Sequence, residues 1–265
     1  MQNPSKHDEK LTLSNESYES VYEQVSRREE MTDESELDFF TRLVPDGKSH
    51  RILDLGCAEG KLAIDLARKG HIVVASDIAE GYLEQVRRNA KSHSVTIETA
   101  RCDIEKDCSS LAGNEFEYIF FMDVIEHLRS PLTGLENVRR LLSNNGSLFI
   151  HTPNACSVGR FYTLLRSRTK TCNNLDPRRV KDLHLQLYDL SSLTQLCNFA
   201  GFEVIRVIPT KMGIPCAGNS RMLAKMFPAL GDTLLVECKK CTPINVKDVV
   251  DYWVSSAEPK MNTTD

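Results

Sequence analysis

The sequence predicts an α/β protein in which a mostly parallel sheet lies between two layers of helices. Short runs rich in Ile, Val, Phe and Leu recur through the 265-residue chain, and segments whose apolar residues have helical spacing separate them. A turn from Gly56 to Gly60 directly follows the first of these runs. Such alternation joins parallel strands through right-handed crossovers, so ligands are expected at the carboxyl ends of the strands.

Seven strands are expected. The first five alternate with helices, whereas the last two are joined by a Gly- and Pro-bearing stretch that suits an elaborated hairpin. The predicted fold class is therefore α/β, a Rossmann-like three-layer sandwich with a seven-stranded, mostly parallel sheet and one antiparallel edge strand. The strands are expected at residues 51–55, 71–76, 95–100, 117–122, 147–152, 203–209 and 232–238.

Helices are predicted where apolar residues recur three or four positions apart. Asp33 and Glu36 match a capping box for a first helix that buries Leu37, Phe40 and Val44. Four further sets show the same spacing: Leu62, Ala63, Leu66 and Ala67; Tyr82, Leu83 and Val86; Leu135, Val138, Leu141 and Leu142; and Leu190, Leu193, Leu196 and Phe199.

The length and the 41% apolar content predict a single sizeable domain with a full core. Residues 1–14 are expected to be disordered, because the acidic N-terminal stretch shows no helical periodicity there. The domain itself is expected at 15–240, with an N-terminal helical cap and a basic lid insertion near 155–188. Residues 241–265 are expected to form a C-terminal tail.

A net charge of −4 argues against general adhesion to nucleic acid or to membrane surfaces. We find neither a long apolar run nor a basic N-terminus followed by an apolar stretch, so no membrane span and no secretory signal is expected. The nine cysteines are scattered and most lie in apolar runs, which predicts free thiols in a reducing compartment. The pair Cys238 and Cys241 has no second pair beside it and receives no functional role. We expect a cytoplasmic protein and leave its oligomeric state open.

The glycine turn predicts a nucleoside-binding site. Asp77, which closes the next apolar run, stands where an acidic residue can accept both ribose hydroxyls. A dinucleotide site is disfavoured because Ala58 and Lys61 replace the second and third glycines of its pattern. A phosphate-binding P-loop is disfavoured because Leu62 stands where Ser or Thr would hold magnesium.

Asp54, two residues before Gly56, indicates which nucleoside binds. A carboxylate there would repel a pyrophosphate. It would attract an ammonium and a sulfonium group, since opposite charges at close range attract by about 4 kcal/mol at a surface-like dielectric. The sequence therefore predicts S-adenosylmethionine as the cofactor and S-adenosylhomocysteine as its product.

Several motifs together resemble those of class I S-adenosylmethionine-dependent methyltransferases, in particular the group of ubiquinone-biosynthesis O-methyltransferases and other small-molecule methyltransferases. The resemblance covers roughly residues 15–240, and Ala58 departs from it, because the commonest version of the motif has glycine there. The matching segments are Ile52–Gly60, Val74–Ile78, Ala100–Ile104, Phe121–Leu128 and Ile150–Asn154.

The resemblance implies a cofactor site at the ends of the first four strands. It places the methionine part of the cofactor at the glycine turn, the ribose at the second strand, the adenine between two isoleucines, and the methyl group at the fourth strand. The implied contacts are Asp54, Gly56, Cys57 and Gly60 for methionine, Asp77 for ribose, Asp103, Ile104 and Ile78 for adenine, and Met122 and Asp123 beside the methyl group.

Methyl transfer from a sulfonium mainly requires the acceptor atom to be aligned, which contributes up to about 7 to 11 kcal/mol. An acceptor that is protonated at neutral pH also needs a base, and histidine suits that role. His127 and His184 are the candidate catalytic residues, and His151 ranks below them. The expected reaction is transfer to a small-molecule acceptor, at an oxygen atom.

Two other functions stay open. In some relatives an acidic-x-x-Glu-His run helps bind a divalent metal, and the run from Asp123 to His127 is similar, which allows metal-assisted 2′-O-methylation of RNA. Its first acid is Asp rather than Glu, so no metal ligand is assigned here and nucleic acid is not the expected partner. The other function is a cofactor-binding module without catalysis. Residues 160–181 hold seven basic residues and one acidic residue, which favours an anionic acceptor.

Overall fold

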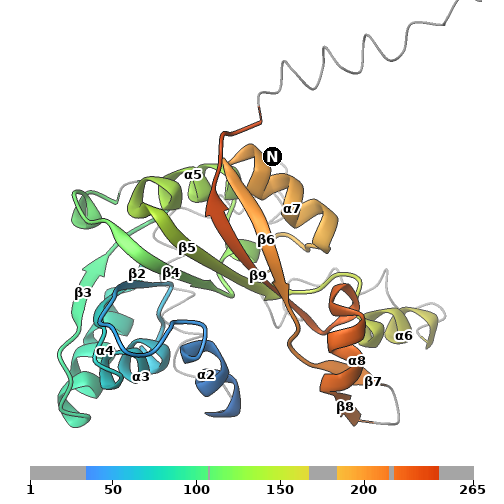
Figure 1. Ribbon diagram of the computed structural model, residues 1–265, viewed down its shortest axis with the longest axis horizontal. Coiled ribbons are helices and arrows are strands. Elements are labelled where there is room, and N and C mark those ends of the chain that lie inside the picture. The colour runs from blue at the N-terminus through green and yellow to red at the C-terminus, as the bar shows by residue number, and fades with distance from the viewer. Residues whose placement is uncertain (1–33, 107, 167–183, 215–217, 245–265) are drawn as a thin grey trace, which may run out of the picture.

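The computed structural model describes residues 34–106, 108–166, 184–214 and 218–244, and it shows a sheet covered by helices on both faces (Figure 1). The main sheet has seven strands in the order β3-β2-β1-β4-β5-β9-β6. Its strands are β1 Arg51–Leu55, β2 Ile72–Asp77, β3 Glu98–Arg101, β4 Phe116–Met122, β5 Leu142–Pro153, β6 Phe202–Ile208 and β9 Thr233–Lys240.

The sheet confirms the predicted seven-stranded, mostly parallel fold. Strands β1 to β5 pair in parallel, and β9 is antiparallel to both β5 and β6. The antiparallel strand therefore lies one place in from the edge, which β6 occupies, rather than at the edge itself. The long connection after β6 lets the chain return between β6 and β5, and it carries a small hairpin of β7 Met212–Ile214 and β8 Gly218–Ser220.

The helices form two layers because alternate residues of each strand point to opposite faces. Phe120 and Phe149 belong to the core under α2, α3 and α4, whereas Ile119 and Leu148 belong to the core under α5 and α7. The two groups lie on opposite sides of the sheet in Figure 1. The helices of the first layer are α2 Glu34–Thr41, α3 Lys61–Arg68 and α4 Glu80–Ser92. Those of the second layer are α5 Pro131–Leu141 and α7 Leu190–Phe199.

The long periodic helices were predicted correctly, whereas two short helices and three 3₁₀ turns were missed. Leu37, Phe40 and Val44 of the first predicted helix are all buried. The missed helices expose large apolar residues, for example Phe161 at 61% and Met222 at 69%, so they show no regular pattern of burial. These helices are α6 Val158–Arg166 and α8 Arg221–Met226, accompanied by the short 3₁₀ turns η1 Ser109–Leu111, η2 Ile125–His127 and η5 Pro228–Leu230.

Several predictions concern residues outside the described ranges. The disordered start at 1–14, most of the basic lid at 167–183 and most of the tail at 245–265 belong to this group. Within the described parts of the chain, no helix is both long and apolar enough to cross a membrane.

The prediction of free thiols is wrong for Cys102 and Cys108, which form a disulfide. Their Cα atoms lie 5.1 Å apart across the loop that follows β3, a separation that a disulfide can bridge. Cys238 and Cys241 are both free thiols and form no disulfide with each other. Cys238 instead faces Cys197, with the two sulfur atoms 4.0 Å apart in the core.

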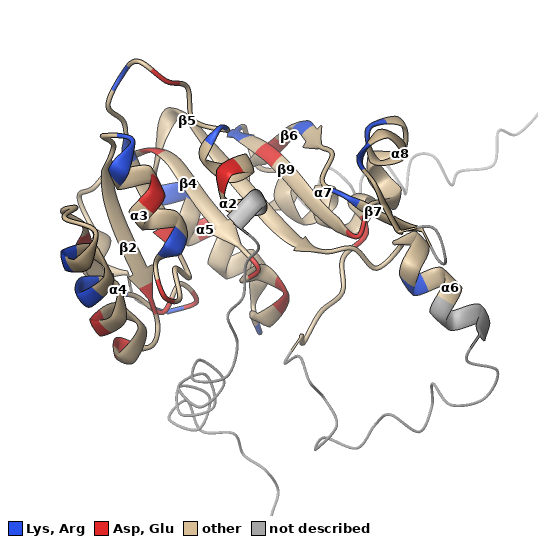
Figure 2. Cartoon of the chain, turned by 90° about the horizontal axis from the view of Figure 1, so that it is seen from below, with Lys and Arg blue, Asp and Glu red and all other residues tan. Residues whose placement is uncertain are grey.

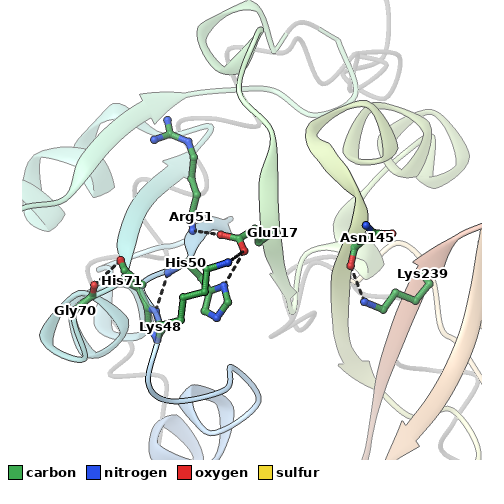
Figure 3. Close-up of polar contacts among 9 residues, drawn as sticks. Lys48, His50, Arg51, Gly70, His71, Glu117, Asn145 and Lys239 are labelled. Atoms are coloured by element: carbon green, nitrogen blue, oxygen red, sulfur yellow. Dashed lines mark hydrogen bonds and ion pairs between the residues drawn. The ribbon is translucent and has the colours of Figure 1, made fainter.

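Polar contacts at the amino-terminal edge of the sheet hold β1, β2 and β4 in register (Figure 3). His50 Nδ1 lies 2.8 Å from Glu117 Oε1, and the backbone amide of Arg51 donates to Glu117 Oε2. The amide of His50 donates to His71 Nδ1 at 3.3 Å. Charged residues otherwise gather on the outer faces of helices such as α3 and α4 (Figure 2). The opposite, carboxyl edge of the sheet is where the predicted functional residues gather.

Candidate active site

The glycine turn after β1 is held in a left-handed conformation at three positions. The φ angles are +77° at Gly56, +45° at Ala58 and +76° at Gly60. The amides of Gly56 and Cys57 both donate to the carbonyl of Ser76, at 2.8 and 3.0 Å, which ties the turn to the end of β2. Ala58 thus adopts a conformation that costs an L-residue free energy, and the surrounding hydrogen bonds maintain it.

Packing also requires the two glycines. A Cβ atom added at Gly56 would lie 2.3 Å from a methyl carbon of Val124, which follows β4. One added at Gly60 would lie 2.7 Å from a methyl carbon of Val86 on α4. The glycines therefore let β4 and α4 approach the turn closely, in addition to any role toward a ligand.

Asp77 connects the turn to the next helix. Its Oδ2 accepts a hydrogen bond from the Ala58 amide at 3.0 Å and its Oδ1 accepts one from the Ala79 amide at 2.9 Å. Burial raises the pKa of this carboxyl, although these amide bonds act in the opposite direction. The predicted contact of Asp77 with a ribose stays a prediction, and the structure adds that both oxygens already order the backbone.

Asp54 is buried within β1, beneath the turn. Burial is the main cause that raises its pKa to about 7, the amide of Ala63 lowers it, and the charge of Asp77 adds to the increase. Within the described residues, Asp54 Oδ2 accepts no hydrogen bond. A buried carboxylate oxygen without a partner is costly, and a cationic ligand would relieve that cost.

The predicted adenine-binding residues lie at the ends of β2 and β3. Asp103 Oδ1 accepts from the Glu105 amide at 3.1 Å, and Oδ2 pairs with Lys106 Nζ at 2.9 Å. Ile104 is buried and belongs to the core next to α5, whereas Ile78 is half-buried. Ile104 therefore has a packing role that does not depend on a cofactor.

At the end of β4, Asp123 pairs with a residue of the neighbouring strand. Met122 is the register partner of His151 on β5. His151 is buried, and its Nδ1 lies 3.0 Å from both carboxylate oxygens of Asp123. His151 was predicted to rank below His127 and His184. Its pairing with Asp123 was not predicted, because a strand register cannot be read from one chain.

The two predicted catalytic histidines come together with Glu126. Ligand atoms of Glu126, His127 and His184 all lie within 4.8 Å of one another, and the two imidazole rings meet edge to face with centroids 4.9 Å apart. The amides of Leu185 and Gln186 donate to the carbonyl of Glu126, which holds the segment after His184 against η2. Glu126 belongs to the run from Asp123 to His127 noted in the sequence, but it was not among the predicted site residues.

Glu126 is the most buried member of this cluster. Burial is the main cause that raises its pKa to about 7, followed by the charge of Asp123. Its Oε2 accepts from the Thr152 hydroxyl at 3.0 Å. Its Oε1 accepts no hydrogen bond within the described residues and lies 4.0 Å from His184 Nε2. Among the described residues, this is the one group whose geometry suits a metal ion.

Substituting Gly56 with alanine is expected to destabilise the fold by about 2 to 4 kcal/mol, because the new methyl group meets Val124 in addition to the strained φ angle. Gly70→Ala is a matched control. Its φ is +88° and nothing lies within 4 Å of the added methyl, so it should lose only about 1 kcal/mol. Urea unfolding of both variants tests this, and equal losses would contradict the packing role of Gly56.

Asp54→Asn is expected to stabilise the ligand-free protein at pH 8. The unfolded carboxyl titrates near a pKa of about 3.9. At pH values between this unfolded pKa and the folded pKa of about 7, the Asp54 carboxyl keeps its proton in the folded state and has lost it in the unfolded chain. Stability is therefore lost as the pH rises through this window. The variant should gain about 2 to 4 kcal/mol over wild type at pH 8 and almost nothing at pH 4.

Urea unfolding at pH 4, 6 and 8 measures this difference. Asp38→Asn is the control, because that side chain is 56% exposed. An Asp54→Asn variant that matches wild type at all three pH values would show that the buried carboxyl carries no such cost.

Comparison with known proteins places this site in a family. The family model of a methyltransferase domain matches residues 26–207. A ubiquinone biosynthesis O-methyltransferase of Coxiella burnetii is 28% identical over 163 residues, which cover 60% of this chain and 66% of that protein. The same enzyme of Dinoroseobacter shibae is 36% identical over 107 residues, or 40% and 42% of the two chains. The matches thus span less than two thirds of these relatives.

Solved structures share the fold at low identity. The magnesium protoporphyrin IX methyltransferase of Synechocystis, with bound S-adenosylhomocysteine, has a TM-score of 0.59 at 15% identity, covering 86% of this chain and 99% of that one. A 1,6-didemethyltoxoflavin-N1-methyltransferase of Burkholderia thailandensis has a TM-score of 0.58 at 15% identity, covering 91% and 93%. On the match over residues 26–207, the chain belongs to the methyltransferase-domain family.

Proposed function

We propose that the protein is an S-adenosylmethionine-dependent methyltransferase that acts on a small-molecule acceptor, at an oxygen atom. The observation that supports this most is the buried, partly unpaired carboxylate of Asp54 beneath the glycine turn. A neutral or anionic nucleoside would leave that carboxylate uncompensated, whereas a sulfonium nucleoside with an α-ammonium group brings positive charge.

The strand order supports the cofactor assignment. Strands β1, β2 and β3 are neighbours, and each carries an acid at or near its carboxyl end: Asp54, Asp77 and Asp103. An extended nucleoside laid along this edge would pass them in that order, with its methionine end at β1 and its adenine at β3. Ile78 and Ile104 lie next to the last two acids in sequence, where an aromatic base would need apolar contacts.

Transfer to oxygen is supported by the names of the curated relatives, which are O-methyltransferases. In such a step the acceptor oxygen bonds to the methyl carbon, the carbon–sulfur bond breaks, and its electron pair stays on sulfur. The hydroxyl proton goes to a base, for which we propose His127 or His184. An anionic acceptor remains part of the proposal, although most of the basic segment that suggests it lies outside the described residues.

Calorimetric titration with S-adenosylhomocysteine tests the cofactor assignment. We expect binding by wild type and at least about tenfold weaker binding by Asp77→Asn, which corresponds to about 1.4 kcal/mol. Glu117→Gln, at the opposite edge of the sheet, is the control and should bind like wild type (Figure 3). Absence of binding at millimolar ligand would reject the proposal. Transfer of a labelled methyl group into fractionated cell extract would then identify the acceptor and separate an enzyme from a silent cofactor-binding module.

The cluster of Glu126, His127 and His184 favours a second candidate, metal-assisted methylation such as 2′-O-methylation of RNA. Carboxylate oxygen and imidazole nitrogen together suit Mn²⁺, Co²⁺ or Zn²⁺, and the unpaired Glu126 Oε1 fits a cation. A divalent ion there would act as a Lewis acid that orients a hydroxyl and lowers its pKa. Asp123 does not belong to the group, since His151 binds it.

Titration with Mn²⁺, followed by electron paramagnetic resonance, tests the second candidate without an acceptor. We expect Glu126→Gln and His127→Ala to weaken Mn²⁺ binding by at least about tenfold, in line with the loss of a ligand group. His93→Ala is the control, because this histidine lies at the exposed end of α4. Mn²⁺ binding that is absent in wild type, or unchanged in both cluster variants, would contradict metal assistance.

A further inference from the structure

We infer that Asp123 makes the site selective for the positively charged methyl donor over its neutral product, and that His151 is the residue that positions Asp123 for this role. The inference rests on the proposed function, because it concerns the same cofactor. It adds a specificity that neither the motifs nor the relatives assign to this pair.

Asp123 is fixed in place by His151 through both its backbone and its side chain. The backbone amide of Asp123 donates to the His151 carbonyl at 2.9 Å, while His151 Nδ1 lies 3.0 Å from each carboxylate oxygen. The φ angle of Asp123 is +52°, a left-handed conformation that Asp and Asn adopt more readily than other side-chain-bearing residues. The carboxylate therefore has a defined direction at the end of β4.

His151 is itself well anchored. It is buried on β5, and the ring of Phe40 from α2 packs against its imidazole with centroids 5.4 Å apart. Its Nδ1 lies within hydrogen-bond distance of both oxygens of Asp123, so the imidazole fixes the direction in which that carboxylate points.

Asp123 lies beside the glycine turn. Leu55 is the register partner of Phe121, so the chain leaves β1 and β4 side by side. Val124, which directly follows Asp123 in the sequence, packs against Gly56. The Asp123 side chain is 40% exposed at this edge, which leaves it accessible to a ligand held on the turn.

The other acids at this edge are less suited to the task. Both oxygens of Asp77 accept backbone amides, and Asp103 pairs with Lys106. Asp54 is buried within β1, and Glu126 is buried in the histidine cluster. Asp123 combines a fixed direction with access to a ligand.

The chemistry of the cofactor gives this charge a function. Before transfer the sulfur carries three carbon substituents and one positive charge, and after transfer it carries two and is neutral. A carboxylate beside the sulfur attracts the donor and gains nothing from the product. The pair would therefore favour loading of S-adenosylmethionine and release of S-adenosylhomocysteine.

Calorimetry with three probes tests the inference without an acceptor. The probes are S-adenosylmethionine, sinefungin, which carries an ammonium group in place of the methylsulfonium, and S-adenosylhomocysteine. The ratio of the product Kd to the donor Kd is compared between variants, because it is independent of the folded fraction. We expect Asp123→Asn to lower this ratio about five- to tenfold for both charged probes, since asparagine keeps the left-handed conformation and removes the charge.

His151→Leu should lower the ratio about as much, because it leaves Asp123 without its donor. His151→Asn, which keeps a nitrogen donor near the Nδ1 position, should restore most of it. Asp103→Asn is the control and should weaken all three probes by a common factor. An Asp123→Asn ratio within twofold of wild type overturns the inference, and a His151→Asn ratio no better than that of His151→Leu overturns the role of His151. If wild type binds none of the probes, the cofactor assignment fails and this inference fails with it.

Discussion

The carboxylate of Asp77 is the contact on which the arrangement of the site depends. It joins the turn after β1 to the start of α4 through two backbone amides, those of Ala58 and Ala79. The Ser76 carbonyl adds two bonds to the same turn. Together they keep left-handed residues in a loop that would otherwise relax, and they leave the space above Gly56 to be closed by Val124. The position of β4 relative to the turn follows from this contact.

Two buried carboxyls, Asp54 and Glu126, give the carboxyl edge its electrostatic character. Burial raises the pKa of each to about 7, and each has one oxygen without a hydrogen bond in the described structure. Such groups destabilise a ligand-free fold. A bound cation would offset this cost, because its positive charge would compensate the carboxylate oxygens that accept no hydrogen bond. Asp54 lies on β1 and Glu126 just after β4, so under the proposed function one half of the edge would hold the cofactor and the other half the acceptor.

The seven-stranded, mostly parallel sheet and the long helices could be predicted because their apolar residues repeat with a clear period. The cofactor contacts could be proposed because Asp54, Asp77 and Asp103 lie at or near the carboxyl ends of the first three strands, and their contact with a cofactor stays a prediction. The pairing of Asp123 with His151 could not be predicted, because it depends on the register of β4 against β5. The grouping of Glu126 with His184 could not be predicted either, because the two residues are far apart in the sequence and only the fold brings them together. The position of β9 inside the edge was missed for a similar reason, as hairpin order is not encoded in periodicity.

The short segment after β4 links the two halves of the site. Met122 and Asp123 end the strand, Val124 packs on the glycine turn, and the next two residues begin η2 and supply Glu126. Under the proposed function, Met122 and Asp123 would contact the cofactor and Glu126 would lie toward the acceptor, on one continuous segment. In-line methyl transfer depends on the distance between donor and acceptor atoms, to which rates are very sensitive. In the proposed enzyme, one short segment that is held to β5 through His151 would carry both sets of contacts, so the backbone of that segment would set the distance between them.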